Sequence, residues 1–119
     1  MKFLNSFKYA LQGIKHCSFF EKNFRIQLVI ALLAIVSGIF FKISTVEWLA
    51  ILFCSSLVLS LEMVNTTIEK LSNVLTEKIH PVIKQVKDIA AGAVFLVSIM
   101  SFIIGTIIFL PKIYCYLNY

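Results

Sequence analysis

Charged residues are scarce in this chain: Asp, Glu, Lys and Arg make up 14% of its 119 residues, whereas hydrophobic residues make up 60%. An ordinary water-soluble domain carries about 25% charged residues, so that class is excluded. The apolar residues form three separate stretches, and a globule of this size has too small a core to hide them all. The sequence therefore predicts that lipid is the solvent of this protein.

Cysteines and the common catalytic motifs are also sparse or absent. The chain has three cysteines, Cys17, Cys54 and Cys115, with no CxxC or Cys/His spacing. An odd number of widely spaced cysteines argues against a disulfide framework, and we interpret all three as packing residues. There is no Walker A sequence, kinase glycine-rich loop, HExxH or GxSxG, so the usual soluble solutions to catalysis are missing.

Three stretches suit transmembrane helices, at about residues 26–43, 46–65 and 89–110. Residues 1–22 differ, because the apolar and polar side chains of residues 2–15 separate onto two sides of a helix, which predicts an amphipathic helix lying flat at the membrane surface. No small-residue cleavage pattern follows the first apolar stretch, so we expect this N-terminal segment to be retained. The expected fold is an all-α membrane protein in a single domain, residues 1–119, with an interfacial helix and three spans.

Prolines mark the expected limits of the third helix. Pro81 suits the first turn of a helix, which would run from the polar segment 70–88 into the third span. Pro111 is predicted to end that helix, since proline interrupts helical hydrogen bonding.

The basic residues are bunched. Lys and Arg number 11 against 6 Asp and Glu, for a formal net charge of +5. Basic residues cluster before the first span and within residues 70–88, with few on the other side. The positive-inside rule therefore places the N terminus and residues 70–88 in the cytoplasm and the C terminus outside. Bunching beside apolar spans points to anionic lipid rather than nucleic acid as the charged partner.

The most informative segment is Glu62-Met63-Val64-Asn65-Thr66-Thr67-Ile68-Glu69. Its helical spacing places Glu62, Asn65 and Glu69 on nearly one face. A carboxylate inside a span is costly unless it is paired, protonated or bound to a metal, so Glu62 needs a function. Glu69 follows about 10 Å further along the axis, a reach comparable to a triphosphate with its metal. One carboxylate could transfer a proton while the other holds Mg²⁺.

Two further groups are expected near this face. Lys87 and Asp88, with Lys84 one turn earlier, stand at the start of the third helix, where a lysine can bind phosphate. Glu21, with Arg25 one turn later, is a second acidic candidate at the same depth, and two carboxylates could share one metal.

Simpler interpretations stay open from the residues alone. A glutamate at the end of a span can lie at the interface without a function, and the lysines can serve only to orient the spans. His16 and His80 are most simply interfacial or capping residues. An enzyme and a non-enzymatic helical bundle that senses lipid through its N-terminal helix both fit these patterns.

These motifs resemble those of the prokaryotic diacylglycerol kinase family, which are small trimeric membrane enzymes. The family signature Glu-x-x-Asn-[Ser/Thr]-[Ala/Thr]-Ile-Glu stands here as residues 62–69, and its Lys-Asp pair followed by small residues stands as residues 87–93. A Glu-x-x-Phe-Arg element stands as residues 21–25, and a His-Pro pair as residues 80–81. The resemblance covers about residues 6–111, nearly the whole chain.

The resemblance implies an ATP-dependent lipid kinase that works as a homotrimer with shared active sites in the bacterial inner or plasma membrane. It implies that Glu62 takes the proton from a lipid hydroxyl, with Asn65 and Arg25 at the lipid substrate. It further implies that Mg²⁺ is held with the ATP phosphates and that the nucleotide lies against one set of side chains. Glu21 and Glu69 would bind both Mg²⁺ and ATP, and Tyr9, His80, Lys87 and Asp88 would contact ATP.

The resemblance also bears on the substrate and on one missing charge. The Val46-Glu47-Trp48 turn, the small residues after Asp88 and the Phe-Leu-Pro-Lys sequence at 109–112 look more like the Gram-positive undecaprenol kinases, so undecaprenol is favoured with diacylglycerol close behind. The family usually has an Asp four residues after the second signature Glu. This chain has Asn73 there, which removes one charge near the expected nucleotide.

Overall fold

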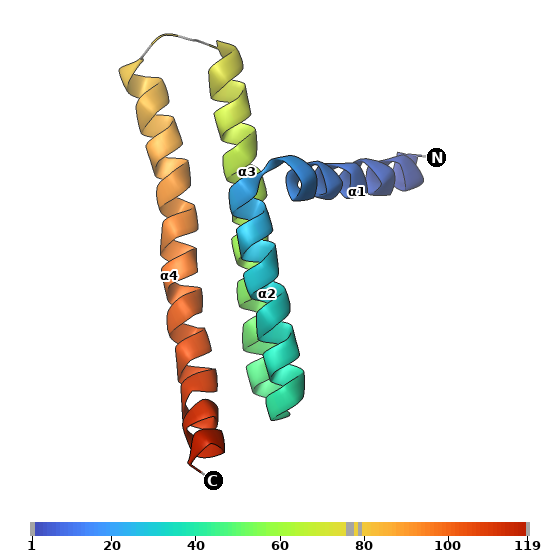
Figure 1. The fold of residues 1–119 in the computed structure, drawn as a ribbon. Coiled ribbons are helices and arrows are strands. Elements are labelled where there is room, and N and C mark those ends of the chain that lie inside the picture. The colour runs from blue at the N-terminus through green and yellow to red at the C-terminus, as the bar shows by residue number, and fades with distance from the viewer. Residues whose placement is uncertain (1, 76–77, 79, 119) are drawn as a thin grey trace.

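The computed structural model describes residues 2–75, 78 and 80–118, and these residues form four helices. Three of them pack side by side, and the N-terminal helix extends sideways away from that bundle (Figure 1). The all-α architecture predicted from the sequence is confirmed. The helices are α1 (Lys2–Phe20), α2 (Lys22–Phe41), α3 (Thr45–Leu75) and α4 (Pro81–Leu117).

Helices α2, α3 and α4 are each long and apolar enough to cross a membrane, as predicted. With 20 residues, α2 is about 30 Å long, which matches the hydrocarbon core of a bilayer. With 31 and 37 residues, α3 and α4 are about 46 and 55 Å long, so both must protrude from that core. Figure 1 shows both helices continuing past the level of α1 toward the turn that joins them.

Helix α1 has the amphipathic character that the sequence predicts. Its apolar side chains, including Phe3, Leu4 and Phe7, are exposed, and Cys17 is its one buried residue among those described. The helix passes close to α3, because a Cβ added to Gly13 would lie 3.9 Å from Cε of Met63. The exposed apolar side suits the boundary between headgroups and acyl chains, and this contact sets the depth of α1 at the level of Met63.

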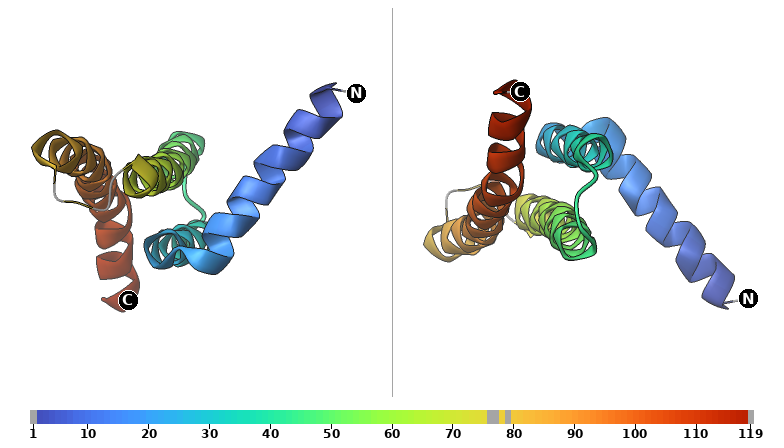
Figure 2. Two further views of the ribbon diagram at one scale, coloured as in Figure 1. Left: turned by 90° about the horizontal axis from the view of Figure 1, so that it is seen from above. Right: turned by 90° about the horizontal axis from the view of Figure 1, so that it is seen from below.

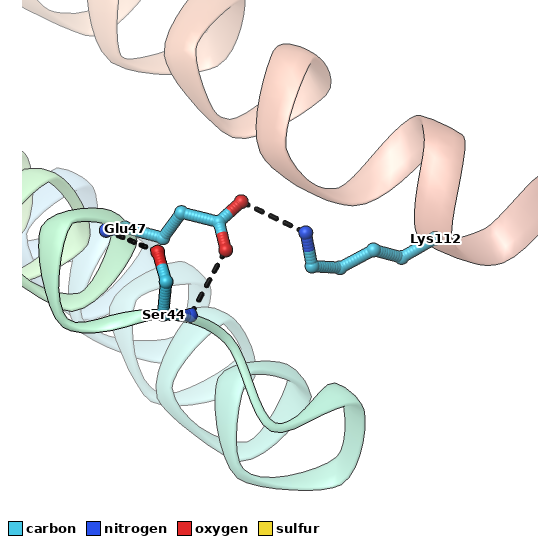
Figure 3. A network of polar contacts seen from close by, with 3 residues as sticks. All are labelled: Ser44, Glu47 and Lys112. Carbon is cyan, nitrogen blue, oxygen red and sulfur yellow. Dashed lines mark hydrogen bonds and ion pairs between the residues drawn. The ribbon is translucent and has the colours of Figure 1, made fainter.

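The turn between α2 and α3 is built from two capping motifs. Lys42 ends α2 in the left-handed conformation (φ 51°), and the Ile43 N–H donates to the Gly38 carbonyl at 3.2 Å, as in a Schellman motif. Ser44 and Glu47 then form a capping box, in which each backbone N–H donates to the other residue's side chain, at 2.9 and 3.2 Å (Figure 3). A tight antiparallel connection of α2 and α3 follows.

Gly38 is required by the close packing of this turn. A Cβ at this position would lie 2.8 Å from Cη2 of Trp48 and 3.0 Å from Cδ1 of Ile43, which is closer than carbon atoms normally approach. We expect Gly38→Ala to lower the free energy of unfolding by about 1–3 kcal/mol, because the indole ring would have to move. Thermal unfolding of the detergent-solubilised protein measures this.

Gly105→Ala is the matched control for that measurement. A Cβ on Gly105 meets no heavy atom of the described chain within 4 Å. Alanine should therefore be tolerated there and add about 0.5–1 kcal/mol through its better helix propensity. Equal stability of the two alanine variants would contradict the packing role of Gly38.

Pro111 does not end the last helix, and the prediction that it would is wrong. Helix α4 continues through Pro111 to Leu117, because proline removes one backbone donor while neighbouring contacts hold the segment. Lys112 donates to the Glu47 carboxylate at 2.8 Å (Figure 3), and the Tyr116 ring lies 5.5 Å from that of Phe40. These contacts join the end of α4 to the turn between α2 and α3.

The opposite end of α4 begins as predicted, at Pro81. His80 caps it, since its Nδ1 accepts a hydrogen bond from the Val82 N–H at 3.2 Å. The polar segment 70–88 is more helical than its composition suggests, because α3 continues to Leu75 before the turn. Residues 76, 77 and 79 of that segment lie outside the described residues.

Candidate active site

A polar stripe runs along the protruding end of α3 and consists of Glu62, Asn65, Glu69 and Asn73. At 3.6 residues per turn these positions fall within about 80° of one another around the helix. Glu62 and Asn65 are buried, at 5% and 8% exposed, whereas Glu69 and Asn73 are exposed. The stripe thus leads from the interior of the protein at the depth of α1 to the open surface.

Glu62 is a buried carboxyl group that pairs with no cation of the described residues. Among the described residues it forms no ion pair or hydrogen bond, and the charged groups that act on it are the carboxylates of Glu69 and Glu21. A buried acid without a partner is costly, so such a group in a membrane protein usually has a function. Its proximity to two other carboxylates brings together three of the acidic residues that the sequence singled out.

Asn65 lies between Glu62 and Glu69 along the stripe. Its Nδ2 donates to Oε1 of Glu69 at 3.2 Å. Its Oδ1 is buried and, within the described part of the chain, accepts no hydrogen bond. An unused buried acceptor suits a bound group that donates a hydrogen bond or carries positive charge.

Glu21 lies where α1 meets α2, and it holds the third carboxylate near this stripe. Its carboxylate is 3.7 Å from Nζ of Lys70 on α3, an ion pair that links the two parts of the site. Nearby, burial raises the pKa of the Cys17 thiol, and the negative charge of Glu21 raises it further. Cys17 is therefore an uncharged thiol at neutral pH, which agrees with its interpretation as a packing residue. Cys115, by contrast, is exposed.

The start of α4 carries two lysines with different partners. Lys84 donates to the Asp88 carboxylate at 2.7 Å within its own helix. Lys87 instead reaches α3 and donates to the side-chain amide oxygen, Oδ1, of Asn73, also at 2.7 Å. The second contact brings the basic start of α4 to the outer end of the polar stripe. His80 remains at the helix cap, where it contacts the Val82 N–H.

Tyr9 lies apart from this cluster, whereas Arg25 is bonded to Glu21 through its backbone and turns its side chain to another partner. Tyr9 is 65% exposed on α1, and α1 points away from α4 in all three views (Figures 1 and 2). Arg25 donates to the Phe19 carbonyl at 3.0 Å, so it stabilises the junction of α1 and α2. The described residues of one chain therefore bring together the acidic stripe, Glu21 and Lys87, while Tyr9 belongs to a different side of the molecule.

The acidic groups fit Mg²⁺ only in combination with a second ligand. No group of three His, Cys, Asp or Glu side chains within the described ranges could enclose a metal ion. Mg²⁺ normally takes one or two carboxylates and fills its remaining positions with water and substrate phosphates. Glu69, Glu21 and the unused oxygen of Asn65 are hard oxygen donors of the type that Mg²⁺ prefers.

A separate cavity of about 520 Å³ lies deeper in the spans, among α2, α3 and α4. Its lining is mainly apolar and includes small residues such as Ala34, Ser55, Ser101 and Gly105. None of the acidic residues of the stripe lines it. Its walls suit hydrocarbon rather than phosphate, so the polar stripe is the better candidate for a site that binds a nucleotide.

Sequence reasoning did not identify two of the contacts that assemble the site. Lys70 is one of the basic residues of segment 70–88, from which the sequence predicts only the orientation of the spans, although it pairs with Glu21. The sequence distinguishes Asn73 only as a position where the family usually has a charged Asp, although its side chain binds Lys87. The spacing of Asn73 four residues after Glu69 is the signal that could have placed it on the stripe, whereas the partner of Lys70 depends on how the helices cross.

Comparison with known proteins assigns the chain to a family. Residues 8–109 match the family model described as prokaryotic diacylglycerol kinase. The chain is 38% identical to the undecaprenol kinase of Bacillus subtilis, over 94% of this chain and 91% of that protein. It is 31% identical to a diacylglycerol kinase of Synechocystis, over 92% of this chain and 63% of that protein. It is also 28% identical to the diacylglycerol kinase of Haemophilus influenzae, over 89% and 91% of the two chains.

These similarities extend over all four helices, and they agree with the three spans and with the motifs of the polar stripe. They decide between the enzyme and the non-enzymatic bundle that the residues alone left open. The chain belongs to the prokaryotic diacylglycerol kinase family, and it is a multi-pass membrane lipid kinase.

Proposed function

We propose that this lipid kinase transfers the γ-phosphoryl group of Mg-ATP to undecaprenol, with diacylglycerol as the second candidate. The observation that carries the ATP-dependent reaction is the polar stripe of α3, which leads from a buried carboxyl group to an exposed carboxylate and a lysine. The order of the two lipids is supported by the higher identity to an undecaprenol kinase, 38%, than to a diacylglycerol kinase, 31%.

Glu62 acts as the general base in this proposal. Its carboxylate accepts the proton of the lipid hydroxyl while that oxygen forms a bond to the γ-phosphorus, and the bond from the γ-phosphorus to the bridging oxygen of ADP breaks. Its depth, level with the interfacial helix, is where a lipid headgroup hydroxyl is found. Asn65 and Arg25 are proposed to contact the lipid.

The nucleotide is proposed to bind over the exposed end of the stripe. Glu69 and Glu21 would hold the magnesium ion, which supplies charge neutralisation on the phosphates when bound. Lys87 would contact the phosphates, and His80, Asp88 and Tyr9 would line the nucleotide. Positioning and charge stabilisation account for most of the catalysis in phosphoryl transfer, so this distribution of charges suits the reaction.

The remaining features concern the assembly and its place in the cell. We place the enzyme in the bacterial inner or plasma membrane with its N terminus and active site in the cytoplasm and its C terminus outside, on the distribution of lysines. A homotrimer with shared sites is supported by the direction of α1, which carries Tyr9 away from α4 of its own chain (Figure 2). Native mass spectrometry of the detergent-solubilised protein checks this, and a monomer would contradict it.

An assay of the purified protein with radiolabelled ATP, Mg²⁺ and a panel of lipid alcohols tests the proposed substrate. Undecaprenol should be phosphorylated with the highest kcat/KM, diacylglycerol more slowly, and omission of Mg²⁺ should abolish both reactions. Preference for diacylglycerol would reverse the order of the two lipids. Transfer to neither lipid, by protein that remains folded, would refute the proposed reaction.

A further inference from the structure

The cavity among α2, α3 and α4 is elongated along the spans. Its lining extends on α2 from Gln27 to Phe41 and on α4 from Ser98 to Ile113. At 1.5 Å per residue each of these ranges covers about 20 Å, or about two thirds of the hydrocarbon core of a bilayer. The cavity therefore follows the direction in which the hydrocarbon chains of the surrounding lipid run.

The two ends of this cavity differ in chemistry. At the end near α1, Nε2 of Gln27 donates to Oγ of Ser98 at 3.4 Å. At the opposite end, the rings of Phe41 and Phe109 lie 6.3 Å apart. Both pairs join α2 to α4 and both line the cavity, so one end is polar and the other is aromatic.

The polar end of the cavity adjoins the buried end of the polar stripe. Val58 lines the cavity, and Glu62 follows it by one turn of α3, about 6 Å along the axis and about 40° around it. Both side chains are buried. On α2, Gln27 lies two residues beyond Arg25. A lipid whose hydroxyl is at Glu62 would thus have the cavity directly below its headgroup.

The size and lining of the cavity suit a hydrocarbon chain. Its volume of about 520 Å³ falls within the range of about 300–1,000 Å³ that is typical of ligand sites. An α-helix about 10 Å across would occupy about 1,600 Å³ over 20 Å, so a helix of a second copy is too large for this space. The cavity is partly open to its surroundings, so a chain longer than the cavity can continue into the bilayer.

We infer that this cavity receives the part of the hydrocarbon chain next to the hydroxyl of the lipid alcohol. The inference rests on the proposed transfer of phosphate to a lipid hydroxyl at Glu62. Because the chain moves from one apolar environment to another, the hydrophobic effect contributes little to its binding. The cavity acts instead by orientation, since a chain held along α3 keeps its hydroxyl in position for the reaction.

Photolabelling of the full-length, detergent-solubilised protein tests the occupant without requiring catalysis. The probe is a long-chain alcohol that carries a diazirine within its chain. Adducts should form at lining residues such as Cys54 and Ser101, and excess undecaprenol should suppress them. Adducts confined to exposed side chains outside the cavity, such as Leu49 and Phe53, would overturn the inference, and so would adducts in the cavity that undecaprenol does not suppress.

Filling the cavity tests its part in the reaction. Ser55→Leu fills it from α3 and Gly105→Leu from α4, and each should lower kcat/KM for undecaprenol by about 10-fold. Both variants should bind a non-hydrolysable Mg-ATP analogue as the wild type does, with unchanged thermal unfolding. Ser56→Leu is the matched control, because Ser56 is exposed and does not line the cavity, and it should keep normal transfer.

The outcomes separate the inference from the proposed reaction. If the wild type transfers phosphate to no lipid although the probe labels the cavity, the proposed reaction fails and the binding of a chain stands. If the wild type phosphorylates undecaprenol and Ser55→Leu, Gly105→Leu and Ser56→Leu all keep normal transfer, the inference is overturned. Dissociation of the oligomer by Ser55→Leu, measured by native mass spectrometry, would identify a second copy as the occupant and would also overturn it.

Discussion

Replacing Glu62 by glutamine is expected to reduce phosphoryl transfer by about 10²–10⁴-fold, the range that a general base contributes. The amide has nearly the same shape as the carboxyl group but cannot accept the proton of the lipid hydroxyl. Because Glu62 is buried and forms no ion pair with the described residues, removal of its charge should leave the fold intact. Radiolabelled phosphate transferred to the lipid in mixed micelles, with thermal unfolding in parallel, measures both properties.

Two further variants test whether the loss of transfer is specific to the carboxylate of Glu62. Glu62→Asp keeps the base but withdraws it by one methylene, so it should lose about 10²-fold, consistent with the cost of a misplaced catalytic group. Glu47→Gln makes the same chemical change on the same helix at the opposite end, where the carboxylate binds Lys112 (Figure 3). It should keep near-normal transfer. Activity of Glu62→Gln equal to that of Glu47→Gln would show that Glu62 is not the base.

Replacing Glu69 by glutamine is expected to raise the Mg²⁺ concentration needed for half-maximal activity by about 10–100-fold, as for other losses around a metal site. The amide would still accept a hydrogen bond from Asn65, so the change removes the charge without breaking that contact. A titration of activity with Mg²⁺ at fixed ATP measures the effect, and excess Mg²⁺ should restore part of the activity. An unchanged Mg²⁺ requirement with unchanged ATP affinity would refute the metal role of Glu69.

Much of this fold follows from local patterns. Length and composition predict the three spans. The spacing of apolar side chains in residues 2–15 predicts the amphipathic α1, and the preference of proline for the first turn of a helix predicts that α4 begins at Pro81. The capping box of Ser44 and Glu47 also has a local sequence signal, because Ser-x-x-Glu before an apolar stretch is typical of this motif. These features depend on residues within a few positions of one another.

The features that local patterns could not predict depend on contacts between helices. The local rule that proline ends a helix fails at Pro111, where the segment beyond is held by Lys112, whose partner Glu47 is 65 residues away. In the same way, the spacing of residues 62–69 predicts a polar face but not that Glu21 contacts Lys70 or that Lys87 contacts Asn73. Helix periodicity determines which residues share a face, whereas the crossing of the helices determines what that face meets.

The proposed reaction requires two functions on one face of α3. The buried end accepts the proton of the lipid hydroxyl, and the exposed end binds the nucleotide. Equilibrium binding of a non-hydrolysable Mg-ATP analogue to Glu62→Gln and Glu69→Gln tests it most directly. Glu62→Gln should bind the analogue as the wild type does although it transfers almost no phosphate, and Glu69→Gln should bind it at least about 10-fold more weakly. Loss of binding in Glu62→Gln together with normal binding in Glu69→Gln would contradict the account.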